Sequence, residues 1–139
     1  MKSLLKPNGQ ISILDYNHTM LEWNPLPPES MQEFYKTFLK WRKDAGMNNA
    51  IADDLANLFK ETGFDNIEVL NSDELFNKDV LDYKSKIGIW SKVAGSNQMV
   101  EEGYLGDNLR LKAIEEYNNW IENEAVSMTM KLNEVRGSL

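Results

Sequence analysis

The chain has 139 residues, a formal net charge of −7 at pH 7 and no cysteine. This length allows a single modest domain, 1–139, with a hydrophobic core of ordinary size. The lack of cysteine excludes a disulfide framework and a thiolate nucleophile, and the single histidine excludes a multi-histidine metal site within one chain. The acidic balance disfavours nucleic acid and anionic membranes as partners.

The sequence shows no targeting or membrane-spanning segment. The apolar run near the first residue is far too short for the core of a signal peptide. No run of apolar residues approaches the length of a membrane span. We therefore expect a cytoplasmic protein with no membrane partner.

The first predicted element is a strand that follows a tight turn. The Lys-Pro-Asn-Gly sequence at 6–9 is typical of a turn, because proline presets φ and Asn-Gly tolerates positive φ. Isoleucine and leucine within 10–16 then predict a largely buried strand. Three prolines within 25–28 forbid a helix interior and disfavour a central strand, so 17–28 is expected to be a loop.

Two amphipathic helices and a second strand come next. The first helix has Ser30 at the start of a capping box and is expected to end near Gly46. The second helix is predicted over 50–62, with Gly63 as its C-terminal cap. A strand over 67–70 follows it.

Helices are expected to fill most of 79–123. Apolar residues at three- and four-residue steps predict a helix over 79–94, then a short helix over 96–102 and a longer helix capped by Asp107. Apolar and polar residues alternate over 126–133, which predicts a final strand and favours antiparallel pairing. The order of elements predicts an α/β fold with about three strands, the last of them antiparallel.

Three stretches resemble the C-terminal half of a class I S-adenosylmethionine-dependent methyltransferase. Residues 4–10 (LLKPNGQ) resemble the LKPGG turn before the fifth strand of that fold, with Asn8 in place of the first glycine. Residues 58–64 (LFKETGF) resemble the helix end before the sixth strand, and 67–69 (IEV) resemble that strand. In that partial Rossmann-like fold, the seventh strand pairs antiparallel with the sixth and lies beside the fifth. The strand near 125–135 fits the seventh.

The resemblance implies a complete enzyme that transfers a methyl group from S-adenosylmethionine to a small-molecule substrate. It also implies that 79–123 is a helical insertion that covers the substrate. A narrower subgroup assigned to this family is similar through 15–18, 23–28 and 40–42.

The first half of the family's cofactor site has no counterpart in this sequence. The family uses a glycine-rich turn to approach the cofactor and an acidic residue for its ribose, whereas the glycines here are isolated. The resemblance therefore implies association with a missing N-terminal half. No tight binding of S-adenosylmethionine by this chain alone is expected.

Candidate site residues follow the first predicted strand, where open α/β sheets bind ligands. A methyl acceptor needs a base near the transferred methyl, and His18 is the candidate because an imidazole titrates near neutral pH. Asp15 could orient His18 or bind substrate, and Asn17, in the same stretch after the first strand, is a further candidate substrate residue. The alternatives are a loop histidine bonded to backbone and an aspartate that only forms a turn.

Aromatic and basic residues nearby could complete a substrate pocket. Tyr16, Trp23 and Trp41 could wall an apolar acceptor, and the planar guanidinium of Arg42 could hold an anionic group. The alternatives are core packing for the aromatic residues and an interaction of Arg42 with the helix dipole. The adjacent acidic pairs do not share a face of a helix and are not expected to bind metal.

Two other hypotheses remain open from the sequence. The chain could be a truncated, non-enzymatic α/β domain that forms a homodimer through the exposed edge of its first strand or through uncovered helices. It could also be another small α+β binding module. A sheet without an antiparallel member would favour that last hypothesis.

Overall fold

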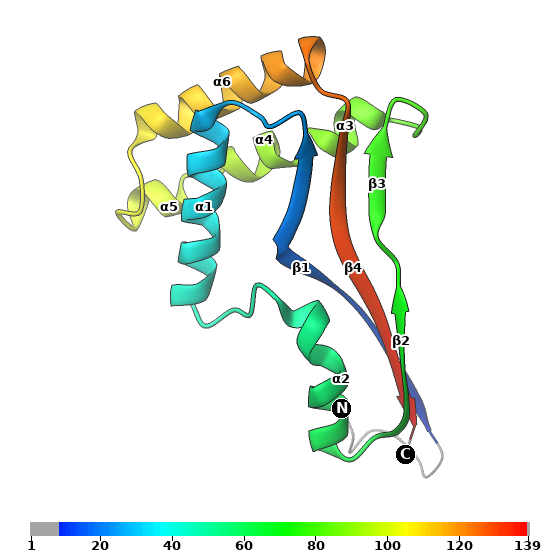
Figure 1. Ribbon diagram of the computed structural model, residues 1–139. Coiled ribbons are helices and arrows are strands. Elements are labelled where there is room, and N and C mark those ends of the chain that lie inside the picture. The colour runs from blue at the N-terminus through cyan, green and yellow to red at the C-terminus, as the bar shows by residue number, and fades with distance from the viewer. Residues whose placement is uncertain (1–8, 139) are drawn as a thin grey trace. The chain divides into compact units, whose positions relative to one another are not determined.

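The computed structural model describes residues 9–138, so most of the turn predicted over 6–9 lies outside the described residues. These residues divide into two compact units (Figure 1). The first unit takes its residues from 9–21, 49–74 and 130–138, and the second from 22–48 and 75–129. The single domain 1–139 with an insertion at 79–123 stays a prediction.

Strand β1 runs from Gln10 to Asn24, so the expectation of a loop beginning at residue 17 is wrong. Residues such as Thr19 and Trp23 favour extended backbone, and no proline interrupts the strand before its end. The strand stops where the prolines begin, and the peptide bond between Asn24 and Pro25 is cis. The proposed site residues from Asp15 to His18, and Trp23, therefore lie within a strand rather than after one.

The sheet has the order β1-β4-β2, and β3 also pairs with β4. Its other strands are β2 (Asp65–Asn71), β3 (Glu74–Asn77) and β4 (Ser127–Ser138). Strand β4 pairs antiparallel with β2, with Val69 opposite Val135, and the arrows in Figure 1 show β1 running parallel to β2. The antiparallel last strand is confirmed. The sheet has four strands rather than three, because β3 is too short to show a pattern in the sequence.

The strand order agrees with the order that the methyltransferase resemblance implies. The resemblance implies that β1, β4 and β2 take the places of its fifth, seventh and sixth strands, and the last strand in sequence does lie between the other two. The described residues form a mixed α/β fold around an antiparallel pairing. They do not form a doubly wound parallel sheet, so the Rossmann-like assignment stays a prediction.

The core of the first unit lies between the sheet and helix α2 (Ile51–Thr62). Leu55 and Phe59 of α2 pack with Phe64 and Val135. Gly63 caps the helix in the left-handed region at φ 97°, as predicted, because a residue without Cβ adopts that conformation at little cost.

The second unit contains the remaining helices, and its core is aromatic. The helices are α1 (Glu29–Asp44), α3 (Tyr83–Ile87), α4 (Ile89–Ala94), α5 (Gln98–Glu101) and α6 (Asp107–Asn123). The ring centroids of Tyr117 and Trp120 lie 5.2 Å apart, and those of Tyr35 and Trp90 lie 4.8 Å apart. Such pairs add stability beyond the area they bury.

Several helix boundaries differ from the predicted ones. The helix expected over 79–94 is two short helices that meet at Gly88, and the first begins only after Asp82, whose φ is 57°. The expected capping box does not form, because α1 begins at Glu29 and Ser30 is buried. Asp107 is the first residue of α6 rather than its cap.

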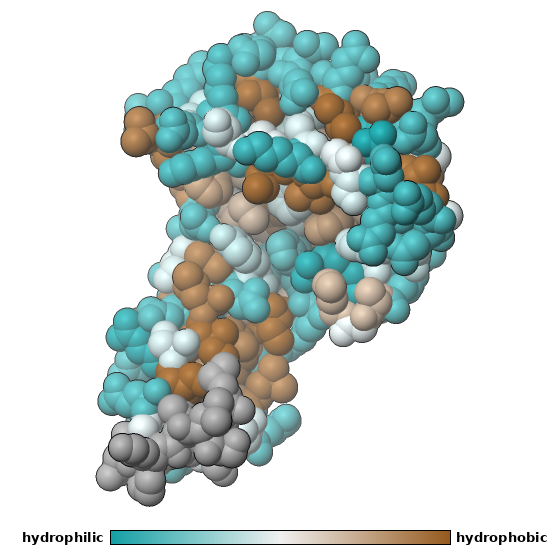
Figure 2. All heavy atoms as spheres, turned by 180° about the vertical axis from the view of Figure 1, so that it is seen from behind, coloured by the Kyte–Doolittle hydropathy of each residue, from teal (hydrophilic) through white to brown (hydrophobic). Residues whose placement is uncertain are grey.

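The surface carries hydrophobic residues in several separate places (Figure 2). Leu14, Leu58 and Leu81 are among the exposed large side chains. Within residues 9–138, no helix is both long enough and apolar enough to cross a membrane.

Candidate functional site

The residues predicted for the site fall into two groups, one in each unit. The first unit holds Asp15, Tyr16, Asn17 and His18, and the second holds Trp23, Trp41 and Arg42.

Tyr16 and His18 share one face of β1. Their rings stack with centroids 5.7 Å apart and an angle of 29° between the ring planes. The Tyr16 hydroxyl donates a hydrogen bond to Oε1 of Glu74 at 2.8 Å, and the His18 backbone N–H donates to the carbonyl of Asn49 at 2.7 Å. This face places an imidazole beside a phenol and a carboxylate. Proton transfer to or from a bound substrate is chemistry that such groups can perform.

The phenol of Tyr16 holds its proton tightly. Burial raises its pKa to about 12, and the hydrogen bond to Glu74 and the charges of Glu74 and Asp15 act in the same direction. At neutral pH Tyr16 is therefore a hydrogen-bond donor and not a base.

Asp15 lies on the opposite face of β1 from Tyr16 and His18, because side chains alternate along a strand. Its Oδ1 accepts the backbone N–H of Tyr16 at 2.8 Å. The observed contact of Asp15 is therefore a local one to backbone, which is the alternative that the sequence left open.

Asn17 is a buried polar residue, 3% exposed, at the centre of a hydrogen-bond network. Its Nδ2 donates to Oδ2 of Asp53 at 2.6 Å, and its Oδ1 accepts the backbone N–H of Thr19 at 3.0 Å. Nδ2 of Asn133, on β4, donates to the carbonyl of Ala52 at 3.2 Å and to Oδ1 of Asp53 at 3.4 Å. Two side-chain amides from two strands thus hold the carboxylate of Asp53.

Asp53 lies in the first turn of α2, where the helix dipole favours a negative charge. Sequence reasoning missed its role and that of Asn133. The residues that meet here are separated by 36 and 80 positions in the chain, and no local pattern could have connected them.

Trp23 in the second unit is packed as a core residue. Its Nε1 donates to the Tyr117 hydroxyl at 2.9 Å, and its ring meets the Tyr35 ring edge-on with centroids 5.2 Å apart. The Tyr117 hydroxyl in turn donates to the carbonyl of Ile87 at 2.7 Å. These contacts are those expected if Trp23 packs in a core rather than against a ligand.

Trp41 and Arg42 lie at the C-terminal end of α1. Nε1 of Trp41 donates to Oε2 of Glu102 at 2.9 Å. The Arg42 guanidinium lies 5.7 Å from the centre of the Phe38 ring, in the last turn of the helix. This position also suits an interaction of Arg42 with the helix dipole.

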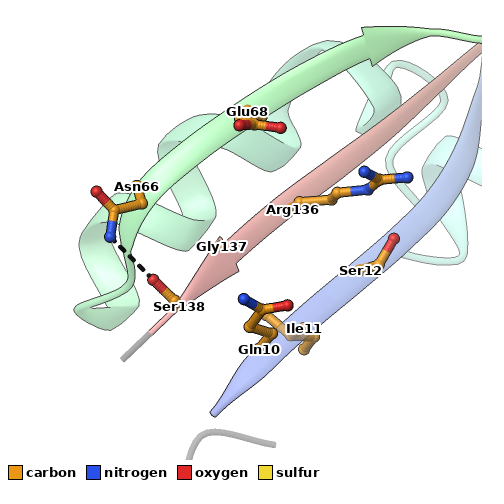
Figure 3. A pocket seen from close by; sticks show the side chains of 8 residues that line it. All are labelled: Gln10, Ile11, Ser12, Asn66, Glu68, Arg136, Gly137 and Ser138. Atoms are coloured by element: carbon orange, nitrogen blue, oxygen red, sulfur yellow. Dashed lines mark hydrogen bonds between the residues drawn. The ribbon is translucent and has the colours of Figure 1, made fainter. Parts of the chain in front are cut away.

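A polar hollow of about 450 Å³ lies at the start of β1 and β2 (Figure 3). Glu68, Arg136 and Ser12 are among the residues that line it, and α2 lies behind the sheet in this view. Arg136 already pairs with Glu134 at 3.1 Å. The hydrogen bond from Arg136 is the main cause that lowers the pKa of Glu134, and the hydrogen bond from Ser12 lowers it further. Ligands of open α/β sheets bind at the carboxyl ends of parallel strands, so this hollow is the weaker candidate site.

Residues 9–138 contain no group of three or more histidine or acidic side chains placed to hold a metal ion. The face of Tyr16 and His18, where an imidazole stacks on a phenol that bonds a carboxylate, is the candidate functional site.

Replacing Tyr16 with phenylalanine should remove a pH-dependent contribution to stability. The folded state raises the pKa of Tyr16 from its usual value near 10 to about 12. The contribution is then fully present below about pH 10 and is lost as pH rises through about 12. Urea unfolding of the wild type and Y16F from pH 8 to 12 measures the difference in their free energies of unfolding. The other tyrosines are present in both proteins, so their titration does not contribute to this difference. A difference that stays constant over this range would contradict the assignment.

Comparisons with known proteins identify no family for this chain. No family model and no curated protein matches it. One similar solved structure is Haemonchus contortus phospholethanolamine N-methyltransferase 2 in complex with phosphomonomethylethanolamine and S-adenosylhomocysteine. The TM-score is 0.37 at 15% sequence identity, and the match covers 96% of this chain and 27% of that one. The chain thus spans about a quarter of the length of that enzyme.

Proposed function

We propose that this chain supplies the substrate side of an S-adenosylmethionine-dependent methyltransferase that acts on a small molecule. The cofactor contacts come from a second segment that carries the glycine-rich turn, and the chain is not active alone. His18 removes a proton from the acceptor while the acceptor attacks the methyl group in line with the departing sulfur.

The strand order supports this proposal. The resemblance of 4–10, 58–64 and 67–69 to the methyltransferase fold requires a seventh strand between the fifth and the sixth, antiparallel to the sixth. Strand β4 lies between β1 and β2 and pairs antiparallel with β2. The residues of these three stretches do not themselves determine where β4 lies, so its position is an independent observation.

The geometry of the first unit suits the proposed chemistry. Stacking on Tyr16 holds the His18 ring, and the bond from the His18 amide to Asn49 fixes the backbone beneath it. An imidazole that is already held in place loses less conformational entropy when it contacts the acceptor. Trp23 and Trp41 as walls of an apolar pocket, and Arg42 as the residue that holds an anionic group, stay predictions from the sequence.

Cofactor binding gives the first test. Titration calorimetry of S-adenosylmethionine into the chain should show no tight, stoichiometric binding. Saturable one-to-one binding at micromolar cofactor would contradict the claim that a second segment supplies the cofactor site.

Reconstitution gives the second test. The chain is combined with the cofactor-binding half of a class I methyltransferase, and transfer of a labelled methyl group to a panel of small hydroxyl and amine compounds is measured. We expect a product whose rate falls about 10²–10⁴-fold in H18Q, the range for loss of a general base. The matched control M20Q, also on β1, should keep the rate. Equal rates in H18Q and the wild type would remove His18 from the mechanism.

A further inference from the structure

The outer edge of β1 is blocked along only part of its length. Within the described residues, β1 pairs with β4 on one side and is the edge strand of the sheet. The amide of Tyr16 is capped by the Asp15 side chain at 2.8 Å, and the amide of His18 is capped by the Asn49 carbonyl at 2.7 Å. Both amides therefore point away from β4, and neither is available to another strand.

The segment Gln10–Leu14 presents the continuation of this edge. Backbone groups alternate in direction along a strand, so the amides and carbonyls of Gln10, Ser12 and Leu14 point outward as those of Tyr16 and His18 do. The segment contains no charged residue and no proline, which are the features that usually protect an edge from pairing.

The side chains of this segment leave apolar surface that an added strand could cover. Ile11 and Ile13 line an apolar hollow of about 290 Å³ together with Leu55, Leu58 and Phe59 of α2. Leu14, on the opposite face, is 58% exposed. A strand added beside Gln10–Leu14 would extend the apolar layer over that hollow.

We propose that Gln10–Leu14 pairs antiparallel with the same segment of a second copy of this chain. Pairing centred on Ser12 places Ile11 opposite Ile13 of the other copy, so that apolar side chains meet on the α2 side. It forms about six main-chain hydrogen bonds, because the outward-facing residues then stand directly opposite one another. The segment carries no charge, so the two copies bring no like charges together. Identical edges related by a two-fold axis are complementary by symmetry.

The capped residues set the register. Pairing centred further along β1 would bring the second strand against the Asp15 side chain and the Asn49 carbonyl, which already occupy the edge. This inference does not depend on the methyltransferase proposal, because it concerns only the edge of β1.

Sedimentation equilibrium of the whole chain tests the proposal over a micromolar range of concentration. The mass should rise from 16.0 kDa toward twice that value. S12K places two lysines opposite each other and should weaken association at least about tenfold. M20K carries the same charge on the same strand beyond the capped residues and should associate like the wild type. A wild type that stays monomeric, or an S12K variant that associates equally well, would overturn the proposal.

Cross-linking tests the register separately. The chain has no cysteine, so a single introduced cysteine reports one contact. In the proposed pairing the two copies of residue 12 have Cα atoms about 5.5 Å apart, within the range of a disulfide. S12C should form a disulfide dimer under mild oxidation, and M20C should not. Dimerisation with efficient linking only in M20C would place the interface elsewhere and refute this pairing.

Discussion

Replacing Trp120 with alanine should lower the free energy of unfolding by about 3–5 kcal/mol, the range for removing a large aromatic side chain from a packed core. Trp120 is 2% exposed, and its ring stacks on Tyr117. Tyr117 in turn bonds Trp23 and the Ile87 carbonyl. The substitution removes a large apolar surface and one side of the packing around that hydroxyl network.

Urea unfolding monitored by far-UV circular dichroism measures this effect. Leu111→Ala on the same helix is the matched control, because Leu111 is 50% exposed and its loss should cost less than about 1 kcal/mol. Equal effects of W120A and L111A would show that the aromatic core of the second unit is not packed as described.

Replacing Asn17 with aspartate should destabilise the first unit by about 2–4 kcal/mol at neutral pH. Nδ2 of Asn17 lies 2.6 Å from a carboxylate oxygen of Asp53, so the variant would place a buried carboxylate in contact with the carboxylate of Asp53, an exposed residue. The change keeps the shape of the side chain and exchanges a donor for a negative charge. Packing is therefore largely unchanged, and electrostatic repulsion supplies most of the cost.

The loss of folding stability in N17D should increase as the pH rises. Repulsion raises the pKa of the introduced carboxyl in the folded state above its unfolded value near 4. Below about pH 4 the introduced carboxyl is protonated and costs little stability. The loss of folding stability grows as pH rises and this carboxyl ionises through its raised folded pKa. Unfolding of wild type and N17D from pH 3 to 8 checks this. Asn57→Asp, on the exposed face of α2, is the control and should cost only a few tenths of a kcal/mol. A penalty for N17D that does not change with pH would contradict the contact with Asp53.

The sequence predicted the elements that have strong local signals. Helix α2 and its Gly63 cap, the strand that follows, and the alternating final strand all depend on patterns within a short window. Strand β1 was predicted too short, because the prolines that end it were assumed to disrupt the residues before them as well. In helix α6, Tyr117 and Trp120 are among the buried residues, whereas Leu111 is 50% exposed.

The candidate site was predicted less well than the fold. Tyr16, Asn17 and His18 do lie together on β1, but their partners come from β3, β4 and the start of α2. Glu74 bonds Tyr16, Asp53 bonds Asn17, and Asn133 bonds Asp53 only after the chain has folded. None of these partners has a distinctive sequence context. A polar residue on a strand shows its own chemistry in the sequence, whereas the group that it will bond depends on tertiary structure.

The position of β4 has a consequence for how the chain folds. Strands β1 and β2 do not pair with each other, and both pair with β4, which follows them in sequence by more than fifty residues. The sheet of the first unit therefore cannot form from its earlier strands alone, and its formation requires closure of a long loop. Strand β4 contributes residues to both units, so each unit lacks part of its chain until β4 has formed. Folding intermediates that lack β4 would consist mainly of helices, with β1 and β2 still unpaired with each other and open to association.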